Sequence, residues 1–270
     1  MSQIPVATFI LPVYNGADFI AESIESILSQ TFQNWTLLIL DNCSSDNTAS
    51  VCAPYLKDER IQYIRHDKNL GLLGNLLKGI ELTQTPYWCY VCHDDKFIDT
   101  TAVQRAFDIL ESDSEIAMVS SPLKWMDAKS NIIFDATEPV NGKLDADQVN
   151  HLMLRRIRIT YGVIMLARTK YVKSFQPDAK WQSVADVDLF ISISKGKKVY
   201  IFEQSSYAIR FHAANNSMKT FSEARSKYLL IAKKHNIQFT KFELFRQYIN
   251  NIIIALGKKL FFIYLEKFRK

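Results

Sequence analysis

The chain has 270 residues, of which 48% are hydrophobic and 23% charged, a composition typical of a globular protein with a sizeable core. Eight glycines, seven prolines and four cysteines are too few for a fibrous chain, a low-complexity chain or a disulfide scaffold. The net charge of +5 arises within residues 241–270, which hold seven cations and two anions, so the first 240 residues are neutral. This distribution does not support a basic surface over the whole body, and we expect no nucleic-acid partner.

The two ends of the chain indicate a location. Residues 1–5 contain neither a basic stretch nor a long apolar stretch, so we expect no secretory signal. The longest uncharged segment near the C-terminus, residues 247–257, has 11 residues and is too short to cross a bilayer. We therefore expect a cytoplasmic protein in a reducing environment.

Short apolar runs alternate with helical patterns from residue 6 to about residue 122. The apolar runs predict strands at residues 8–13, 35–40, 61–65, 88–92 and 116–120. The patterns between them predict helices at residues 18–30, 46–55, 71–82 and 101–112. Strands separated regularly by helices imply crossover connections and a mostly parallel sheet. Because such sheets bind ligands beyond the carboxyl ends of their strands, the candidate site loops are residues 12–16, 41–46, 66–71 and 92–96.

The second half of the chain is less regular. A hairpin is predicted at residues 123–134, with its turn at residues 127–131. The remaining patterns predict strands at residues 160–167, 198–202 and 208–211 and helices at residues 145–156, 186–195, 221–235 and 241–268.

Two of the strand-end loops carry groups suited to a nucleobase. Tyr14 offers an aromatic face, and Asp41 places a carboxylate where the second strand stops. A carboxylate in that place can accept the N3–H of uracil or thymine while the tyrosine ring stacks on the base. The alternative is that Asp41 and Asp46 only form turns and caps, as such residues often do.

An acidic sequence, His93-Asp94-Asp95, follows the fourth strand. Adjacent carboxylates suit a hard cation such as Mg²⁺ or Mn²⁺, with diphosphate oxygens completing the shell, and a solvated acidic turn is the alternative. The sequence contains neither a Gly-x-Gly-x-x-Gly loop nor a Gly-x-x-x-x-Gly-Lys loop. Phosphate charge would therefore need a metal, which disfavours a nicotinamide dehydrogenase or a P-loop ATPase.

Two cysteines, Cys89 and Cys92, form a Cys-x-x-Cys sequence on the same strand. Residues three apart on a strand face opposite sides, so the two thiols should not meet. No second pair completes a zinc site, and we interpret both as core residues.

Two further segments supply groups for catalysis or for phosphate binding. Asp186 opens a helix, where it could act as a general base facing the metal site or simply cap the helix. Arg210 and His212 follow a strand and could meet phosphate or metal, although a lone histidine is more often structural.

Taken in order, these segments resemble the family 2 glycosyltransferases with a GT-A fold, over roughly residues 6–215. The resemblance is carried by Phe9-Ile-Leu-Pro-Val-Tyr-Asn-Gly16, Ser29-Gln-Thr-Phe32, Leu38-Ile-Leu-Asp-Asn-Cys-Ser-Ser-Asp-Asn-Thr48, Asn69-Leu-Gly-Leu72, the acidic sequence, Ala185-Asp-Val-Asp-Leu189 and Arg210-Phe-His212. It implies an α/β fold with a mostly parallel central sheet flanked by helices, whose nucleotide-binding half is Rossmann-like. The implied boundaries are a domain at residues 1–215, divided into a donor half (1–122) and an acceptor half (123–215), and a C-terminal helical extension at residues 216–270.

The resemblance also implies roles for individual residues. The residues implied to bind the donor are Pro12, Tyr14, Asn15, Asp41, Asn69, Gly71, His93 and Asp94. The implied ligands of Mg²⁺ or Mn²⁺ are Asp94, Asp95 and His212, and Asp186 matches the proposed base. The chain departs from the family pattern at Asn42 and Cys92, where Asp is usual, at Ala185, where Glu is usual, and at residues 75–78, where an Arg is missing.

The function implied by the resemblance is that of an inverting glycosyltransferase of bacterial polysaccharide biosynthesis. It would move a sugar from a UDP- or dTDP-sugar to a hydroxyl group of a glycan or lipid-linked glycan, with a metal ion. Two alternatives are a nucleotidyltransferase on a related sheet and a non-catalytic sugar-nucleotide-binding protein.

The C-terminal residues 241–270 combine an apolar stripe at helical spacing with flanking basic and aromatic residues. This pattern is typical of a helix lying on an anionic inner leaflet, which would make the protein peripheral to the membrane. A helix packed on the domain or on a second subunit would show the same pattern.

Overall fold

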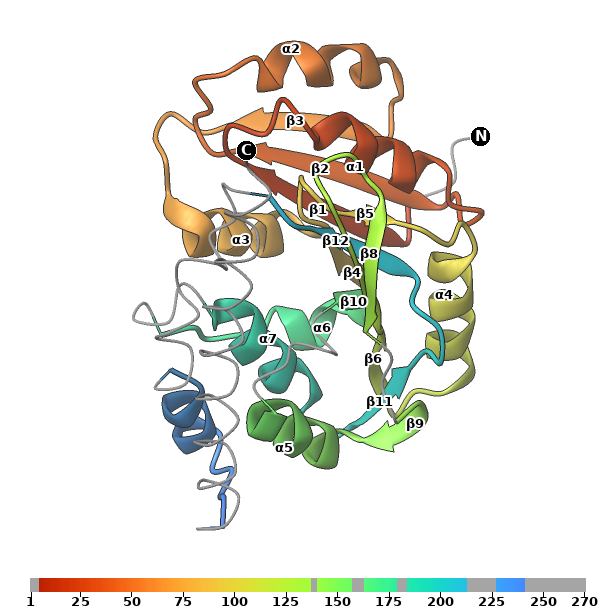
Figure 1. Cartoon of the computed structure of the whole chain (residues 1–270), viewed down its shortest axis with the longest axis vertical. Helices are drawn as coiled ribbons and strands as arrows, with labels where there is room; N and C mark the ends of the chain where they lie inside the picture. The colour runs from red at the N-terminus through yellow and green to blue at the C-terminus, as the bar shows by residue number, and fades with distance from the viewer. Residues whose placement is uncertain (1–4, 137–139, 157–162, 179–183, 213–226, 241–270) are drawn as a thin grey trace, which may run out of the picture.

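The computed structural model describes residues 5–136, 140–156, 163–178, 184–212 and 227–240 (Figure 1). The strands are β1 (Ala7–Val13), β2 (Trp35–Asp41), β3 (Ile61–Arg65), β4 (Tyr87–Tyr90), β5 (Lys96–Phe97), β6 (Ile116–Ser121), β7 (Leu123–Met126), β8 (Ile132–Ala136), β9 (Gly142–Asp145), β10 (Val163–Arg168), β11 (Lys198–Ile201) and β12 (Tyr207–Arg210). The helices are α1 (Ile20–Leu28), α2 (Thr48–Cys52), the 3₁₀ helix η1 (Ala53–Lys57), α3 (Gly71–Leu82), α4 (Ala102–Ser112), α5 (Ala146–Arg156), α6 (Thr169–Val172) and α7 (Ala185–Ser194). Residues 227–234 are also helical.

The strands form two sheets. The large sheet has the order β3-β2-β1-β4-β10-β6-β11-β9, and the small sheet has the order β5-β12-β7-β8. In the large sheet only β9 and β10 run against the other six strands, so the prediction of a mostly parallel sheet is confirmed. Strand β1 lies between β2 and β4, and the loops after these three strands therefore emerge side by side at one edge.

The apolar character of β1 explains its central place. All seven residues of this strand are buried, as expected for a parallel strand covered on both faces. Ile10 belongs to a core shared with α3, α5 and α7, whereas Phe9 and Leu11 belong to a core shared with α1 and α4. Figure 1 shows the same two layers of helices on opposite sides of the sheet. Full burial of a large apolar side chain such as Phe9, Ile10 or Leu11 stabilises the folded state by about 1.5–3 kcal/mol. The two cores therefore hold β1, and with it the edge where the loops after β1, β2 and β4 emerge.

Most predicted elements are present. The helix at 71–82 and the strand at 61–65 coincide with α3 and β3, and the hairpin at 123–134 corresponds to β7 and β8. The elements that the sequence analysis missed, β5, β9 and α6, are two to four residues long and too short to show a period. The helix expected at 241–268 lies outside the described residues, as do residues 160–162 of one expected strand and 221–226 of one expected helix.

No helix in the described part of the chain has both the length and the apolar character needed to span a membrane.

Candidate active site

The loops after β1 and β2 are tied together by hydrogen bonds from the backbone of the first loop. The N–H of Asn15 donates to Ser44 Oγ at 2.9 Å, and the N–H of Gly16 donates to Thr48 Oγ1 at 3.0 Å. Asn15 Oδ1 accepts the N–H of Ser45 at 2.8 Å, and its backbone has a φ of 51°, which asparagine tolerates better than most residues. These hydrogen bonds join the two loops into one rim, on which Tyr14 is 47% exposed.

Gly16 allows this rim to approach the loop after β4. A Cβ atom at Gly16 would lie 2.4 Å from Cδ2 of His93 and 2.5 Å from Cγ2 of Val13, which no side chain could occupy. Burial lowers the pKa of His93 below its usual value, so this ring is neutral at neutral pH. His93 therefore packs as a neutral ring against the β1 loop, next to the buried Pro12.

The carboxylate of Asp41 is completely buried at the end of β2. Its Oδ1 accepts the N–H of Ser44 at 2.8 Å, and its Oδ2 accepts the hydroxyl of Tyr63 and, at 2.8 Å, a guanidinium N–H of Arg65. Burial alone would raise the pKa of Asp41, but these hydrogen bonds outweigh it and lower the pKa. The Asp41 carboxylate is therefore ionised at neutral pH and is held in place by Ser44, Tyr63 and Arg65.

The amide of Asn42 explains one departure from the family pattern. Its Nδ2 donates to Asn69 Oδ1 at 2.8 Å, while its Oδ1 accepts the N–H of Leu70 at 2.7 Å. A carboxylate could not donate to Asn69, so the amide is matched to this loop. Gly71 follows with a φ of 74°, and its N–H also binds Asn69 Oδ1, which fixes Asn69 and Gly71 beside Asp41.

The acidic sequence after β4 forms a compact cluster. The ligand atoms of Cys92, Asp94 and Asp95 all lie within 4.8 Å of one another. Asp94 Oδ2 lies 3.1 Å from Nε2 of His212, so these two predicted metal ligands meet, and Asp95 accepts the N–H of Arg210 at 2.8 Å. Burial, followed by the charge of Asp94, raises the pKa of Asp95 well above its usual value. A cation would relieve this concentration of negative groups.

Cys92 corrects one interpretation made from the sequence. Cys89 is a buried core residue, as expected, but β4 ends at Tyr90 and Cys92 lies beyond the strand with partial exposure. Burial, and then the charges of Asp95 and Asp94, raise the pKa of the Cys92 thiol, which is therefore protonated at neutral pH. Strand periodicity cannot place a residue that lies after the last strand position.

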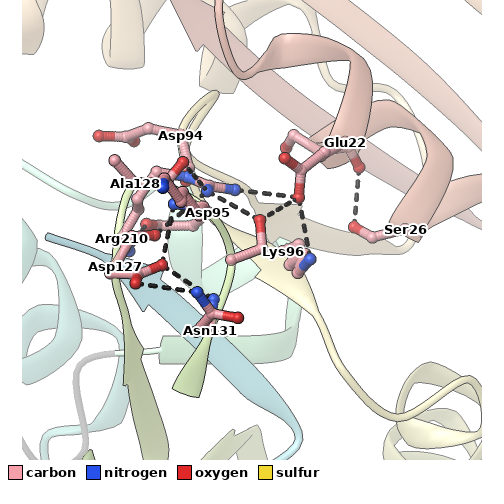
Figure 2. A network of polar contacts seen from close by, with 12 residues as sticks. Glu22, Ser26, Asp94, Asp95, Lys96, Asp127, Ala128, Asn131 and Arg210 are labelled. Atoms are coloured by element: carbon pink, nitrogen blue, oxygen red, sulfur yellow. Dashed lines mark hydrogen bonds and ion pairs between the residues drawn. The ribbon is translucent and has the colours of Figure 1, made fainter. Parts of the chain in front are cut away.

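Arg210 holds the acidic loop rather than facing a ligand (Figure 2). Its side chain is completely buried, and its Nε donates to the carbonyl oxygen of Asp94 at 2.9 Å. The other guanidinium nitrogens donate to Ser130 Oγ at 2.9 Å, to the carbonyl oxygen of Ala128 at 3.2 Å and to Glu22 at 3.1 Å. The hypothesis that Arg210 binds phosphate is therefore wrong, because its guanidinium is committed to three chain segments.

Glu22 is a site-supporting residue that the sequence analysis missed. Burial acts to raise its pKa, but hydrogen bonds from Ser130, Lys96 and Arg210 outweigh this and lower the pKa to about 2. Figure 2 shows the carboxylate of Glu22 between Lys96 and Arg210. In the sequence Glu22 is one of several charged positions on a helix, and no local signal distinguishes it.

Asp186 opens α7 and faces solvent. The protein around it still desolvates the carboxyl group, and this raises its pKa. Its charge and that of Asp94 both help to raise the pKa of Tyr90 and of Cys92, after the larger effect of burial. Asp186 and Asp94 therefore lie near the same end of β4, with Asp41 on the other side of β1.

The fold is a mostly parallel α/β sheet with acidic residues gathered at the carboxyl ends of neighbouring strands. The sequence profile described as "Glycosyl transferase family 2" matches residues 8–172, and the chain belongs to this family. An "Uncharacterized glycosyltransferase" of Rickettsia bellii is 27% identical and covers 80% of this chain, which spans 31% of that protein. The "Putative teichuronic acid biosynthesis glycosyltransferase TuaG" of Bacillus subtilis is 34% identical over 34% of this chain and 37% of its own length.

The fold is shared with a solved structure. TarS 1-349 of S. aureus, in complex with UDP-GlcNAc, superposes with a TM-score of 0.64 at 14% sequence identity. The match covers 84% of this chain and 65% of the TarS chain, and it confirms the expected GT-A fold.

Proposed function

We propose that the protein transfers a sugar from a UDP- or dTDP-sugar to a hydroxyl group of a glycan or lipid-linked glycan, with inversion at the anomeric carbon. We call the loops after β1 and β2, with Asp41, the Asp41 rim, and we call Cys92, Asp94 and Asp95 the Asp94 cluster. The observation that carries this proposal is that Asp41 ends β2 on one side of β1 and the Asp94 cluster follows β4 on the other side. A nucleoside diphosphate would span these two features, with its base at the rim and its phosphates at the cluster. TarS, which shares this fold, has been solved in complex with UDP-GlcNAc, and this supports a nucleotide-sugar donor.

The donor base would lie on the rim between Tyr14 and Asp41. The exposed Tyr14 offers an aromatic stacking surface, and the carboxylate of Asp41 would accept the N3–H of the base. Arg65 has 45% of its side chain exposed, so it is the partner of Asp41 that faces an incoming base. Asn15, Asn69, Gly71 and His93 would shape the loops around the ribose and diphosphate.

A divalent cation fits the donor atoms at the end of β4. Asp94 and Asp95 would offer carboxylate oxygens, and His212, whose Nε2 lies 3.1 Å from Asp94 Oδ2, would offer an imidazole nitrogen. Mn²⁺ accepts both kinds of ligand, whereas Mg²⁺ prefers the oxygens. Such an ion would supply positive charge against the leaving nucleoside diphosphate. The buried Arg210 keeps the loop that carries these ligands in place.

Asp186 would act as the general base. In a single displacement, its carboxylate takes the proton from the acceptor hydroxyl as the oxygen attacks the anomeric carbon, and the bond to the diphosphate breaks. A raised pKa brings the carboxyl group closer to the pH at which a base works well.

Removal of divalent ions is expected to abolish sugar transfer, and Asp94→Ala is expected to reproduce this loss. The reason is that the diphosphate would leave without charge compensation, which typically costs about 10²-fold or more. Turnover is measured with EDTA, after addition of MnCl₂, and with the variant at saturating MnCl₂. Undiminished turnover in EDTA would contradict the metal assignment.

The same assay separates the alternatives. Release of free sugar or its transfer from a nucleotide sugar identifies a glycosyltransferase, whereas release of pyrophosphate from a nucleoside triphosphate identifies a nucleotidyltransferase. Binding without turnover identifies a sugar-nucleotide-binding protein. A thermal-shift panel of nucleotide sugars with MnCl₂ identifies the donor, because a ligand that binds only the native state raises the melting temperature.

We also propose that residues 241–270 hold the protein to the inner face of the cytoplasmic membrane, near a lipid-linked acceptor. Their excess of five positive charges would attract anionic lipids. The full chain is expected to sediment with anionic vesicles, and a version ending at Thr240 is expected to stay in solution. Equal sedimentation of both versions would contradict this location.

A further inference from the structure

The helix at residues 227–234 follows the family-matched residues and packs into the same core as α7. The buried residues of the helix are Tyr228, Ile231 and Ala232, and the buried His235 follows in the next turn on the same face. Tyr228, Ile231 and Ala232 belong to the hydrophobic cluster that contains Val184, Ala185 and Val187, the neighbours of Asp186. The helix is therefore part of the core beside the start of α7.

The end of this helix is fixed in place. Asn236 adopts a left-handed backbone with a φ of 58°, and the N–H of Ile237 donates to the carbonyl oxygen of Ala232 at 2.8 Å. This pattern ends a helix sharply. The ammonium group of Lys195, just after α7, donates to the carbonyl oxygen of His235 at 3.0 Å.

The last turn of the helix supplies two partners to a buried carboxylate in α7. The side chain of Asp188 is 1% exposed, and its Oδ2 accepts the ammonium of Lys234 at 2.7 Å. Its Oδ1 lies 2.7 Å from Nε2 of His235. A carboxylate removed from water is strongly destabilising without such partners. Asp188 therefore binds the helix firmly, and we name these three residues the Asp188 cluster.

Asp188, which Lys234 and His235 hold, lies in the same first turn of α7 as Asp186. Two residues apart on an α-helix, the two side chains point about 200° away from each other. Asp188 accordingly faces the core, and Asp186 faces solvent. Because Asp186 and Asp188 lie within one turn of the same helix, holding Asp188 restricts the rotation of that turn and the direction in which Asp186 points.

We propose that Lys234 and His235 are positioning residues that orient Asp186 through Asp188, so that the helix at 227–234 is a working part of the active site. This inference rests on the proposed role of Asp186 as the base. Tyr228 is a buried residue of the helix at 227–234. Burial, and then the charge of Asp186, raise the pKa of the Tyr228 hydroxyl, which supports the closeness of this helix to the start of α7. A misplaced base lowers turnover without weakening donor binding, because Asp186 contacts the acceptor.

Lys234→Met is expected to lower kcat for sugar transfer by about tenfold and to leave the dissociation constant for UDP within about twofold of wild type. His235→Leu removes the other partner and is expected to behave in the same way. Lys233→Met is the matched control, because Lys233 is the exposed neighbour on the same helix. Lys234→Arg is expected to restore turnover, because it keeps a cation at Asp188.

The full chain is used, with the nucleotide sugar that gives wild-type turnover, and UDP binding is measured by calorimetry with MnCl₂. Turnover of Lys234→Met and His235→Leu within twofold of wild type would overturn the inference. The inference would also be overturned if turnover and UDP affinity fell together and Lys234→Arg did not restore them. A general loss of folded structure would then explain the effect. A wild-type chain without turnover on any nucleotide sugar would reject the proposed function itself, which distinguishes the two failures.

Discussion

Asp186→Asn is expected to lower kcat by about 100-fold or more, because the amide cannot take a proton from the acceptor hydroxyl. Donor affinity should stay unchanged, since the proposed donor contacts lie at the Asp41 rim and the Asp94 cluster. Turnover is measured at saturating donor and acceptor, and UDP binding is measured by calorimetry. Asp108→Asn, which changes an exposed carboxylate on α4, is the matched control and should keep wild-type turnover.

The pH dependence of the same reaction gives a second measurement. A general base works only when it is deprotonated, so kcat falls as the pH drops through the pKa of Asp186. Desolvation raises that pKa, and the fall should therefore begin at a higher pH than for a carboxyl group in water. Near-normal turnover of Asp186→Asn, with the same pH profile as wild type, would remove Asp186 from the base role.

Arg210→Met is expected to lower the free energy of unfolding by about 3 kcal/mol or more. The change removes a buried guanidinium from Glu22 and leaves the carbonyl oxygens of Asp94 and Ala128 without their donor. Denaturant unfolding monitored by fluorescence measures this loss. Lys78→Met breaks an exposed pair with Glu81 and should change the free energy by less than about 1 kcal/mol.

The stability loss in Arg210→Met should also depend on pH. The pKa of Glu22 is lowered from 4.5 to about 2 in the folded protein, so its contribution to stability is present above about pH 4.5 and disappears as the pH falls toward 2. Removing Arg210 moves this pKa back toward 4.5. The difference between wild type and variant should therefore be largest above pH 4.5 and shrink on acidification. A difference that does not change with pH would show that Glu22 and Arg210 are not coupled.

The positions of most site residues follow from the sequence because they depend on local patterns. Apolar runs of five to seven residues predict buried parallel strands, and the ends of such strands predict where ligands bind. Asp41 follows from one such strand end and Asp94 from another, and the structure places them on either side of β1. No strand end predicts Asp186; its place at the start of a helix left a base or a cap open, and the resemblance to the glycosyltransferase family favoured the base.

The local sequence could not reveal the residues that support the site, because their partners are far away along the chain. Arg210 lies 188 positions from Glu22, and Lys234 lies 46 positions from Asp188, yet each pair forms a direct ion pair. Strand periodicity predicts a core position for Cys92, but it does not show that β4 ends at Tyr90.

The sequence by itself determined the class of fold and the edge of the sheet at which Asp41 and Asp94 lie. Only the tertiary structure decided that Arg210 is a buried support, that Asp41 is held by Ser44, Tyr63 and Arg65 and that the helix at 227–234 binds α7. The physical reason is that periodicity reports how one segment faces the core, whereas burial and hydrogen bonding of a charged group depend on which distant segments surround it.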